Sequence, residues 1–309
     1  MRSDNLSPTL SHRSAAAGIA RALLGLAVAG GALAGTPDEP GPPTEQIQIR
    51  VMDGGWGNAR PRDIERVLQS TARELRAYFS QRGADGILVK HVPGNPKVLY
   101  ERGPRGEYIV HLSATDRRWG EYAYQFAHEL CHVLARYELR PSSGTLSHQW
   151  FEEALCETAS LFVLRRLATN WESEPPYPHW RDYAPAFREY AQALMDEPHR
   201  HAADEPLVRW YAAHRVALSR DPYLRSNNEL AATRLLALFE AQPGGWAVLD
   251  SLNAGAAREA LSFSAYLRRW YGAAPAEHRA FLGQVLALFG IAAVGGDRGD
   301  APVSAQQLL

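Results

Sequence analysis

The sequence predicts an α+β protein, with a small mixed β-sheet in its N-terminal half and a mainly α-helical C-terminal half. Short runs with strand-like patterning, separated by Gly- and Pro-rich turns, lie between residues 46 and 112. Beyond Asp116 the hydrophobic residues recur with the period of a helix. The 309 residues are 46% hydrophobic, which supplies enough apolar material for a full-sized core.

The predicted elements follow a simple order along the chain. A strand over 46–51 comes first, and an amphipathic helix over 62–79 follows it. We expect the next three strands to form a meander: 86–91, 97–100 and 108–112. The C-terminal half then supplies helices over 119–137, 150–167, 181–195, 206–219 and 229–240, with further helical segments up to Phe289.

The first 34 residues have the features of a signal peptide. Arginines within 1–21 precede an uncharged apolar run over 22–35, which contains a small-x-small cleavage pattern ending at Ala34. We therefore expect a signal peptide over 1–34, an exposed mature N-terminus over 35–44, and export to the periplasm or the cell exterior. An uncleaved membrane anchor is the alternative, whereas a cleaved chain should have no stable membrane insertion.

Charge and cysteine content narrow the function classes. With 33 basic and 34 acidic residues the formal net charge is -1, so no basic field would gather nucleic acid. Cys131 and Cys156 are too few for a disulfide scaffold or a four-cysteine zinc site. Whether they form one disulfide is open, as is the oligomeric state. A metal ion would have to be held mainly by histidines and carboxylates.

The segment His128-Glu129-Leu130-Cys131-His132 lies inside a predicted helix and has the pattern of a zinc site. Residues four apart share one helix face, so His128 and His132 can direct two imidazole nitrogens at one ion. Glu129 is one step around the helix from His128. It can stand beside the ion without binding it, and take a proton from a water molecule there.

A third ligand is expected from the next helix. Glu153 follows His132 by about twenty residues, and its carboxylate can reach the ion if the two helices pack side by side. Glu152 and His148 are rival third ligands. One helical turn further on, Glu157 could accept the second ring N–H of a ligating histidine and fix its tautomer.

This combination of motifs resembles the gluzincins, the thermolysin-like and aminopeptidase-like zinc metallopeptidases. The resemblance implies a zincin-like core over 45–170, with the sheet and active-site helix as an upper lobe. A helical lower lobe over 171–294 would follow. The segment 295–309 has no periodicity, which predicts a flexible tail. The resemblance also implies that the strand over 108–112 forms the sheet edge where an extended peptide binds.

The resemblance assigns the same roles as the residues themselves. Zinc would be bound by His128, His132 and Glu153, Glu129 would be the general base, and Glu157 would support a histidine. Where the aminopeptidase branch has Asn and Gly around the third ligand, this chain has Glu152 and Ala154. Aminopeptidase activity is therefore not expected.

The oxyanion of such a reaction needs a hydrogen-bond donor from the helical half. Tyr223 and His214 are candidates, favoured only by their distance along the chain. Several other tyrosines and histidines compete, namely Tyr183, Tyr190, His201 and Tyr211.

The sequence thus predicts an exported hydrolase with one zinc ion per chain, most simply a peptidase acting on a peptide or protein substrate. The alternative is an exported zinc-binding protein without catalytic activity. Cleavage specificity, including endopeptidase against exopeptidase action, does not follow from the sequence.

Overall fold

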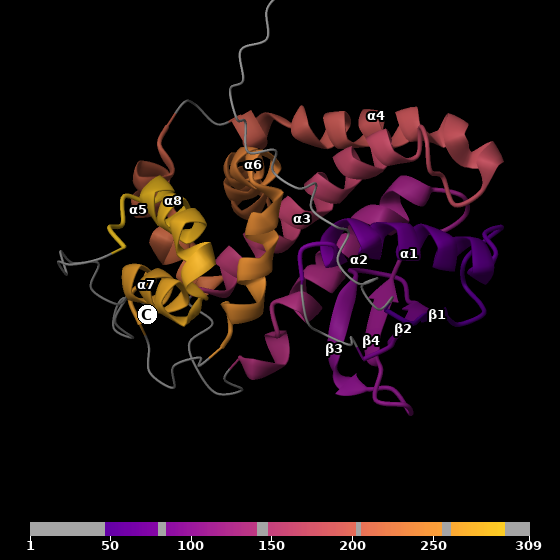
Figure 1. Ribbon diagram of the computed structural model, residues 1–309, viewed down its shortest axis with the longest axis horizontal. Helices are drawn as coiled ribbons and strands as arrows, with labels where there is room; N and C mark the ends of the chain where they lie inside the picture. Colours follow the sequence, from indigo (N-terminus) through magenta and orange to yellow (C-terminus); the bar gives the residue numbers. More distant parts are fainter. Residues whose placement is uncertain (1–46, 80–84, 141–147, 202–204, 255–260, 294–309) are drawn as a thin grey trace, which may run out of the picture. The chain divides into compact units, whose positions relative to one another are not determined.

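The computed structural model describes residues 47–79, 85–140, 148–201, 205–254 and 261–293. The chain has mixed α+β architecture, with one four-stranded sheet and many helices among these residues (Figure 1). The predicted signal peptide over 1–34, the mature N-terminus over 35–44 and the tail over 295–309 lie outside the described residues.

The sheet contains β1 (Ile49–Val51), β2 (Ile87–His91), β3 (Lys97–Arg102) and β4 (Tyr108–Leu112) in the order β1-β2-β4-β3. The strands β1, β2 and β4 are parallel, and β3 runs antiparallel along β4. The predicted meander is therefore wrong, because β2 pairs with β4 and not with its neighbour in sequence.

The edge of the sheet also differs from the expectation. Strand β3, not β4, is the edge strand on this side. Four of the five residues of β4 are buried, whereas β3 begins with Lys97, ends with Glu101-Arg102 and has no buried residue. Charged residues at exposed positions are typical of edge strands, since they discourage pairing with other chains.

Two helices cover one face of the sheet (Figure 1). Helix α1 (Pro61–Arg76) has Pro at its first position, where no N–H is needed, and buries a stripe of apolar residues that includes Ile64 and Leu68. Helix α2 (Trp119–Leu134) packs against α1, β3 and β4. The motif histidines are in its last two turns.

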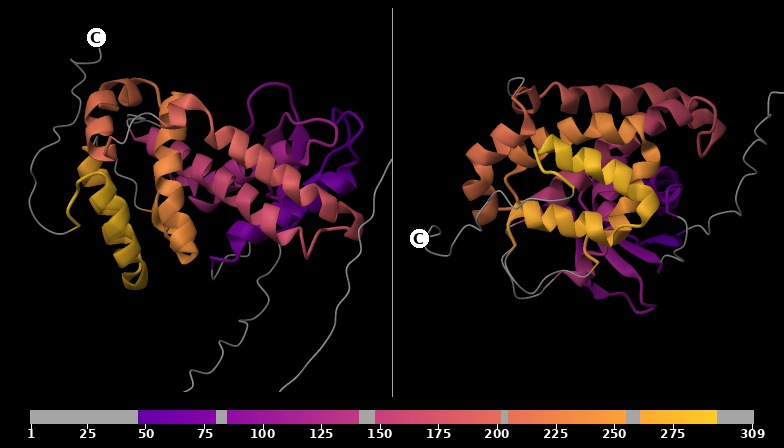
Figure 2. Two further views of the ribbon diagram at one scale, coloured as in Figure 1. Left: turned by 90° about the horizontal axis from the view of Figure 1, so that it is seen from above. Right: turned by 60° about the vertical axis from the view of Figure 1, so that its left-hand side comes forward.

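Helix α3 (Gln149–Asn170) joins the two halves of the sequence. It packs against α2 as well as against α4 (Ala184–Met195) and α6 (Arg225–Ala241), and Figure 2 shows it running among these helices. Most of its residues are buried on every side, as expected for a helix inside the core.

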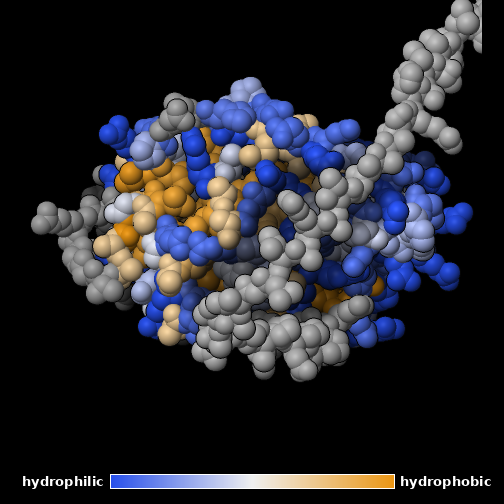
Figure 3. Space-filling view, turned by 45° about the horizontal axis from the view of Figure 1, so that its top comes forward, coloured by the Kyte–Doolittle hydropathy of each residue, from blue (hydrophilic) through white to orange (hydrophobic). Residues whose placement is uncertain are grey.

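The remaining helices are α5 (Leu207–Arg220), α7 (Phe263–Ala273) and α8 (Arg279–Leu288). Helices α5 and α7 contribute to an aromatic cluster around Trp150, at the start of α3, with Tyr211 stacked 5.6 Å and Phe263 tilted 5.1 Å from its ring. Figure 3 shows hydrophobic residues gathered on the left of one face, while hydrophilic residues cover most of the rest. None of the helices in the described ranges is long and apolar enough to span a membrane.

Candidate metal centre

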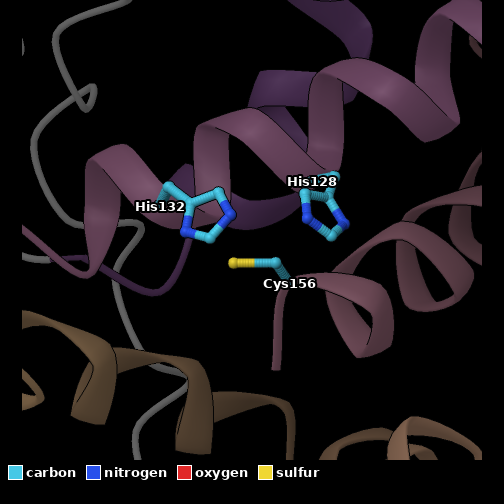
Figure 4. Close-up of side chains that lie close together, drawn as sticks. All are labelled: His128, His132 and Cys156. Carbon is cyan, nitrogen blue, oxygen red and sulfur yellow. The ribbon is translucent and has the colours of Figure 1, made fainter. Parts of the chain in front are cut away.

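The two motif histidines lie side by side on the face of α2 that meets α3. Their ring centroids are 5.1 Å apart, as the spacing of four residues requires (Figure 4). The side chain of His132 is 8% exposed and that of His128 is 22% exposed, so both rings are largely buried and His128 has the greater contact with solvent. The apolar residues Phe126 and Leu130, from the same turns, are buried in the core and hold the helix in place.

Glu153 reaches both histidines from the neighbouring helix. Its Oε2 atom lies 3.2 Å from Nε2 of His128 and 3.5 Å from Nε2 of His132. Zinc bonds of about 2.0–2.1 Å in tetrahedral geometry place two donor atoms about 3.3–3.4 Å apart. The carboxylate oxygen therefore lies at the distance from each ring nitrogen that two ligands of one zinc ion would have.

Glu152, the residue before Glu153, supports the second histidine. Its Oε1 atom accepts a hydrogen bond of 2.7 Å from Nδ1 of His132, so that Nε2 is left as the donor atom for a metal. The other carboxylate oxygen accepts a 3.0 Å hydrogen bond from Asn253, and Arg140 lies 3.8 Å away. Glu152 is 2% exposed, and its neighbours keep its carboxylate in one orientation.

The predicted role of Glu157 is therefore taken by a different residue. Glu157 accepts hydrogen bonds from the hydroxyl of Tyr124 and, at 2.8 Å, from the guanidinium of Arg200. It contacts no histidine among the described residues, because the side-by-side packing of the helices brings Glu157 opposite Tyr124, one turn before His128. Burial, together with the charge of Glu157, holds the pKa of Tyr124 well above its usual value.

Glu129, the predicted general base, is buried next to the histidine pair. It is 4% exposed, and burial raises the pKa of its carboxyl, although the neighbouring charges of His128 and His132 oppose the shift. A hydrogen bond from the backbone N–H of Val98, on the edge strand β3, also opposes it. The carboxyl group thus lies between the histidine pair and the edge of the sheet.

In the metal-free protein, the two histidines and Glu153 stabilise one another's charged forms. Burial by itself would lower the pKa values of both rings, but the hydrogen bond to Glu153 raises that of His128. The charge of Glu153, with the hydrogen bond to Glu152, raises that of His132 well above its usual value. Burial raises the pKa of Glu153, but the two histidines outweigh it and hold that pKa well below its usual range. A cation is thus the natural partner of this carboxylate.

Of the two candidate oxyanion donors, only Tyr223 is connected to the site. Its hydroxyl accepts a 2.7 Å hydrogen bond from Gln149, which also lies 3.4 Å from Oε1 of Glu153. Tyr223 is 60% exposed, so its hydroxyl is accessible to a ligand. His214 instead bonds the Trp210 carbonyl in its own helix and stacks on the Trp210 ring.

His148 does not join the donor set. Its Nε2 atom bonds the backbone carbonyl of Leu261 at 2.7 Å, and its ring packs against Phe263 and Tyr266. His148 directly precedes the first residue of α3. Its contacts with the two aromatic rings hold it away from α2. Of the two rivals, Glu153 and not His148 lies beside both motif histidines.

The two cysteines are free thiols and are both fully buried. The disulfide that the sequence left open is therefore not formed. The Sγ atom of Cys156 and one ring nitrogen each of His128 and His132 all lie within 4.8 Å of one another. Figure 4 shows the Cys156 side chain next to the two rings, with its sulfur toward the His132 side.

Some supporting residues were missed by the sequence analysis because they come from distant segments. Asn253 donates both to Glu152 and, at 2.8 Å, to the carbonyl of Ala135 beyond the end of α2. Arg200, which is 1% exposed, lies in a 3-10 turn between α4 and α5. No sequence spacing indicates either contact.

In comparisons with known proteins, the chain matches no protein-family model and no curated protein.

Proposed function

We propose that this protein is a zinc-dependent hydrolase, and that it acts on peptide bonds. The observation that carries the proposal is the position of Glu153 Oε2, 3.2 and 3.5 Å from the two histidine nitrogens. The set of two imidazoles and one carboxylate is that of catalytic zinc sites, which keep a further position open. The support of His132 by Glu152 fits a metal site for the same reason.

His128, His132 and Glu153 would hold the ion, which when bound supplies Lewis-acid polarisation of a water molecule and of the substrate carbonyl. Glu129 then accepts a proton from the attacking water and transfers it to the leaving amine. The raised pKa of the Glu129 carboxyl suits this exchange, because the group has to hold the proton between the two steps.

The surroundings of Glu129 favour a peptide as the substrate. The carboxyl group lies beside Val98 on β3, and within the part of the chain that the structure describes β3 pairs with β4 alone. An extended peptide could add to the free edge of β3 and bring its scissile carbonyl to the centre. The hydroxyl of Tyr223, across the centre through Gln149, would donate to the developing oxyanion. Export, based on the N-terminal signal pattern, completes the proposal.

The proposal can be tested with the Glu129→Gln variant in an assay of peptide-library cleavage by mass spectrometry. We expect the wild-type protein to cleave, and the variant to retain zinc while its rate falls by about 10²- to 10⁴-fold, the usual contribution of a general base. Full activity in the variant would refute the mechanism. A zinc-loaded wild-type protein that cleaves nothing would favour the non-catalytic binding protein instead.

A further inference from the structure

The fully buried thiol of Cys156 has no part in the proposed reaction, although it lies beside the reacting groups. Cys156 is three residues after Glu153, so both side chains lie on the face of α3 that meets the histidines. Its Sγ atom and one ring nitrogen each of His128 and His132 all lie within 4.8 Å of one another. Figure 4 shows the Cys156 side chain next to the histidine pair, with its sulfur toward the His132 side, and the same thiol hydrogen-bonds with Cys131.

The distances suit a bound ion. Zinc bonds of about 2.3 Å to sulfur and about 2.05 Å to nitrogen place the two atoms about 3.6 Å apart in tetrahedral geometry. An adjustment of the Cys156 side chain by about 1 Å is enough to reach this value from the upper limit of 4.8 Å. The thiol proton leaves to solvent when the sulfur–metal bond forms.

We propose that Cys156 is a further ligand of the metal ion held by His128, His132 and Glu153. This inference rests on the proposed metal centre. Because four protein ligands fill a tetrahedral site, the hydrolytic water of the proposed function would bind only if the ion expands to five ligands or the thiolate leaves it. A thiolate among the ligands selects zinc, cobalt or another borderline or soft divalent ion over magnesium, calcium and manganese, which prefer oxygen.

Cobalt substitution of the full chain tests the inference without relying on activity. Thiolate ligation gives Co²⁺ an intense charge-transfer band in the near ultraviolet, in addition to its weaker visible bands. We expect this band in the wild-type protein and its loss in Cys156→Ser, while the visible bands persist. Cys131→Ser is the matched control, since Cys131 is equally buried and contacts Cys156, and it should retain the band.

X-ray absorption at the zinc edge of the wild-type protein gives an answer that depends on no variant. We expect one sulfur neighbour at about 2.3 Å, beside nitrogen and oxygen neighbours at about 2.0–2.1 Å. Bound metal with nitrogen and oxygen neighbours alone overturns the role of Cys156 and leaves the proposed hydrolase intact. Failure to bind zinc or cobalt at all overturns both proposals.

Discussion

The position of Glu152 leads to a specific prediction, because replacing it should weaken zinc binding without removing a zinc ligand. In Glu152→Gln, the buried charge-assisted hydrogen bond of 2.7 Å to Nδ1 of His132 becomes a neutral one. Hydrogen bonds to charged groups contribute about 1.5–3 kcal/mol, against about 0.5–1.5 kcal/mol for neutral ones. The loss of about 1–1.5 kcal/mol corresponds to about a tenfold weaker affinity for zinc, at the lower end of the 10–100-fold range known for residues that orient metal-binding histidines.

Glu157→Gln is the matched control, since Glu157 lies on the same helix and is 5% exposed, compared with 2% for Glu152. It bonds Tyr124 and Arg200 and no histidine. Its replacement leaves the buried Arg200 with a neutral partner at this position, which should lower the free energy of unfolding but not the affinity for zinc.

The assay is a competition titration with a chromophoric chelator, run beside denaturant unfolding of each metal-free variant. Weaker zinc binding in Glu157→Gln than in Glu152→Gln would refute the assignment. It would restore the role that the sequence spacing gave to Glu157.

Two further predictions concern pH and the oxyanion. Because Glu153 and Glu152 raise the pKa values of His128 and His132 in the metal-free protein, zinc has to displace a proton from each ring. Zinc affinity should therefore fall as the pH drops through these raised pKa values. Because two protons compete with one zinc ion, the fall should reach up to about a hundredfold per pH unit. Zinc-binding calorimetry that shows no change of affinity between pH 5 and 8 would contradict this. Tyr223→Phe should lower kcat by about 10²- to 10³-fold with zinc content unchanged, while His214→Gln should leave kcat as it is; equal effects of the two would exclude Tyr223 as the donor.

Local sequence patterns were sufficient to predict most elements and the core of the candidate site. The helical period and the turn residues located α1, α2 and α3 to within a few residues at each end. The separation of His128 and His132 by four residues required their rings to be neighbours, and the carboxylate at Glu153 was the expected third donor. These predictions depend on short-range geometry, which helix periodicity determines.

The parts that the sequence did not predict depend on contacts between distant segments. The pairing of β2 with β4 is a choice of partner that strand patterning does not encode, although the charges of β3 are a signal for an edge strand. The sequence could not show whether Glu152 or Glu157 supports His132, because the angle at which α3 meets α2 decides which carboxylate faces that ring. Asn253 and Arg200 come from loops and turns whose positions only the folded chain defines.

The central claim is that His128, His132 and Glu153 hold one metal ion, and elemental analysis of the purified protein tests it most directly. We predict about one zinc per chain in the wild-type protein, and its loss from His132→Ala and Glu153→Ala variants that remain folded. A folded wild-type chain that contains no zinc, and takes up none when zinc is supplied, would contradict the account.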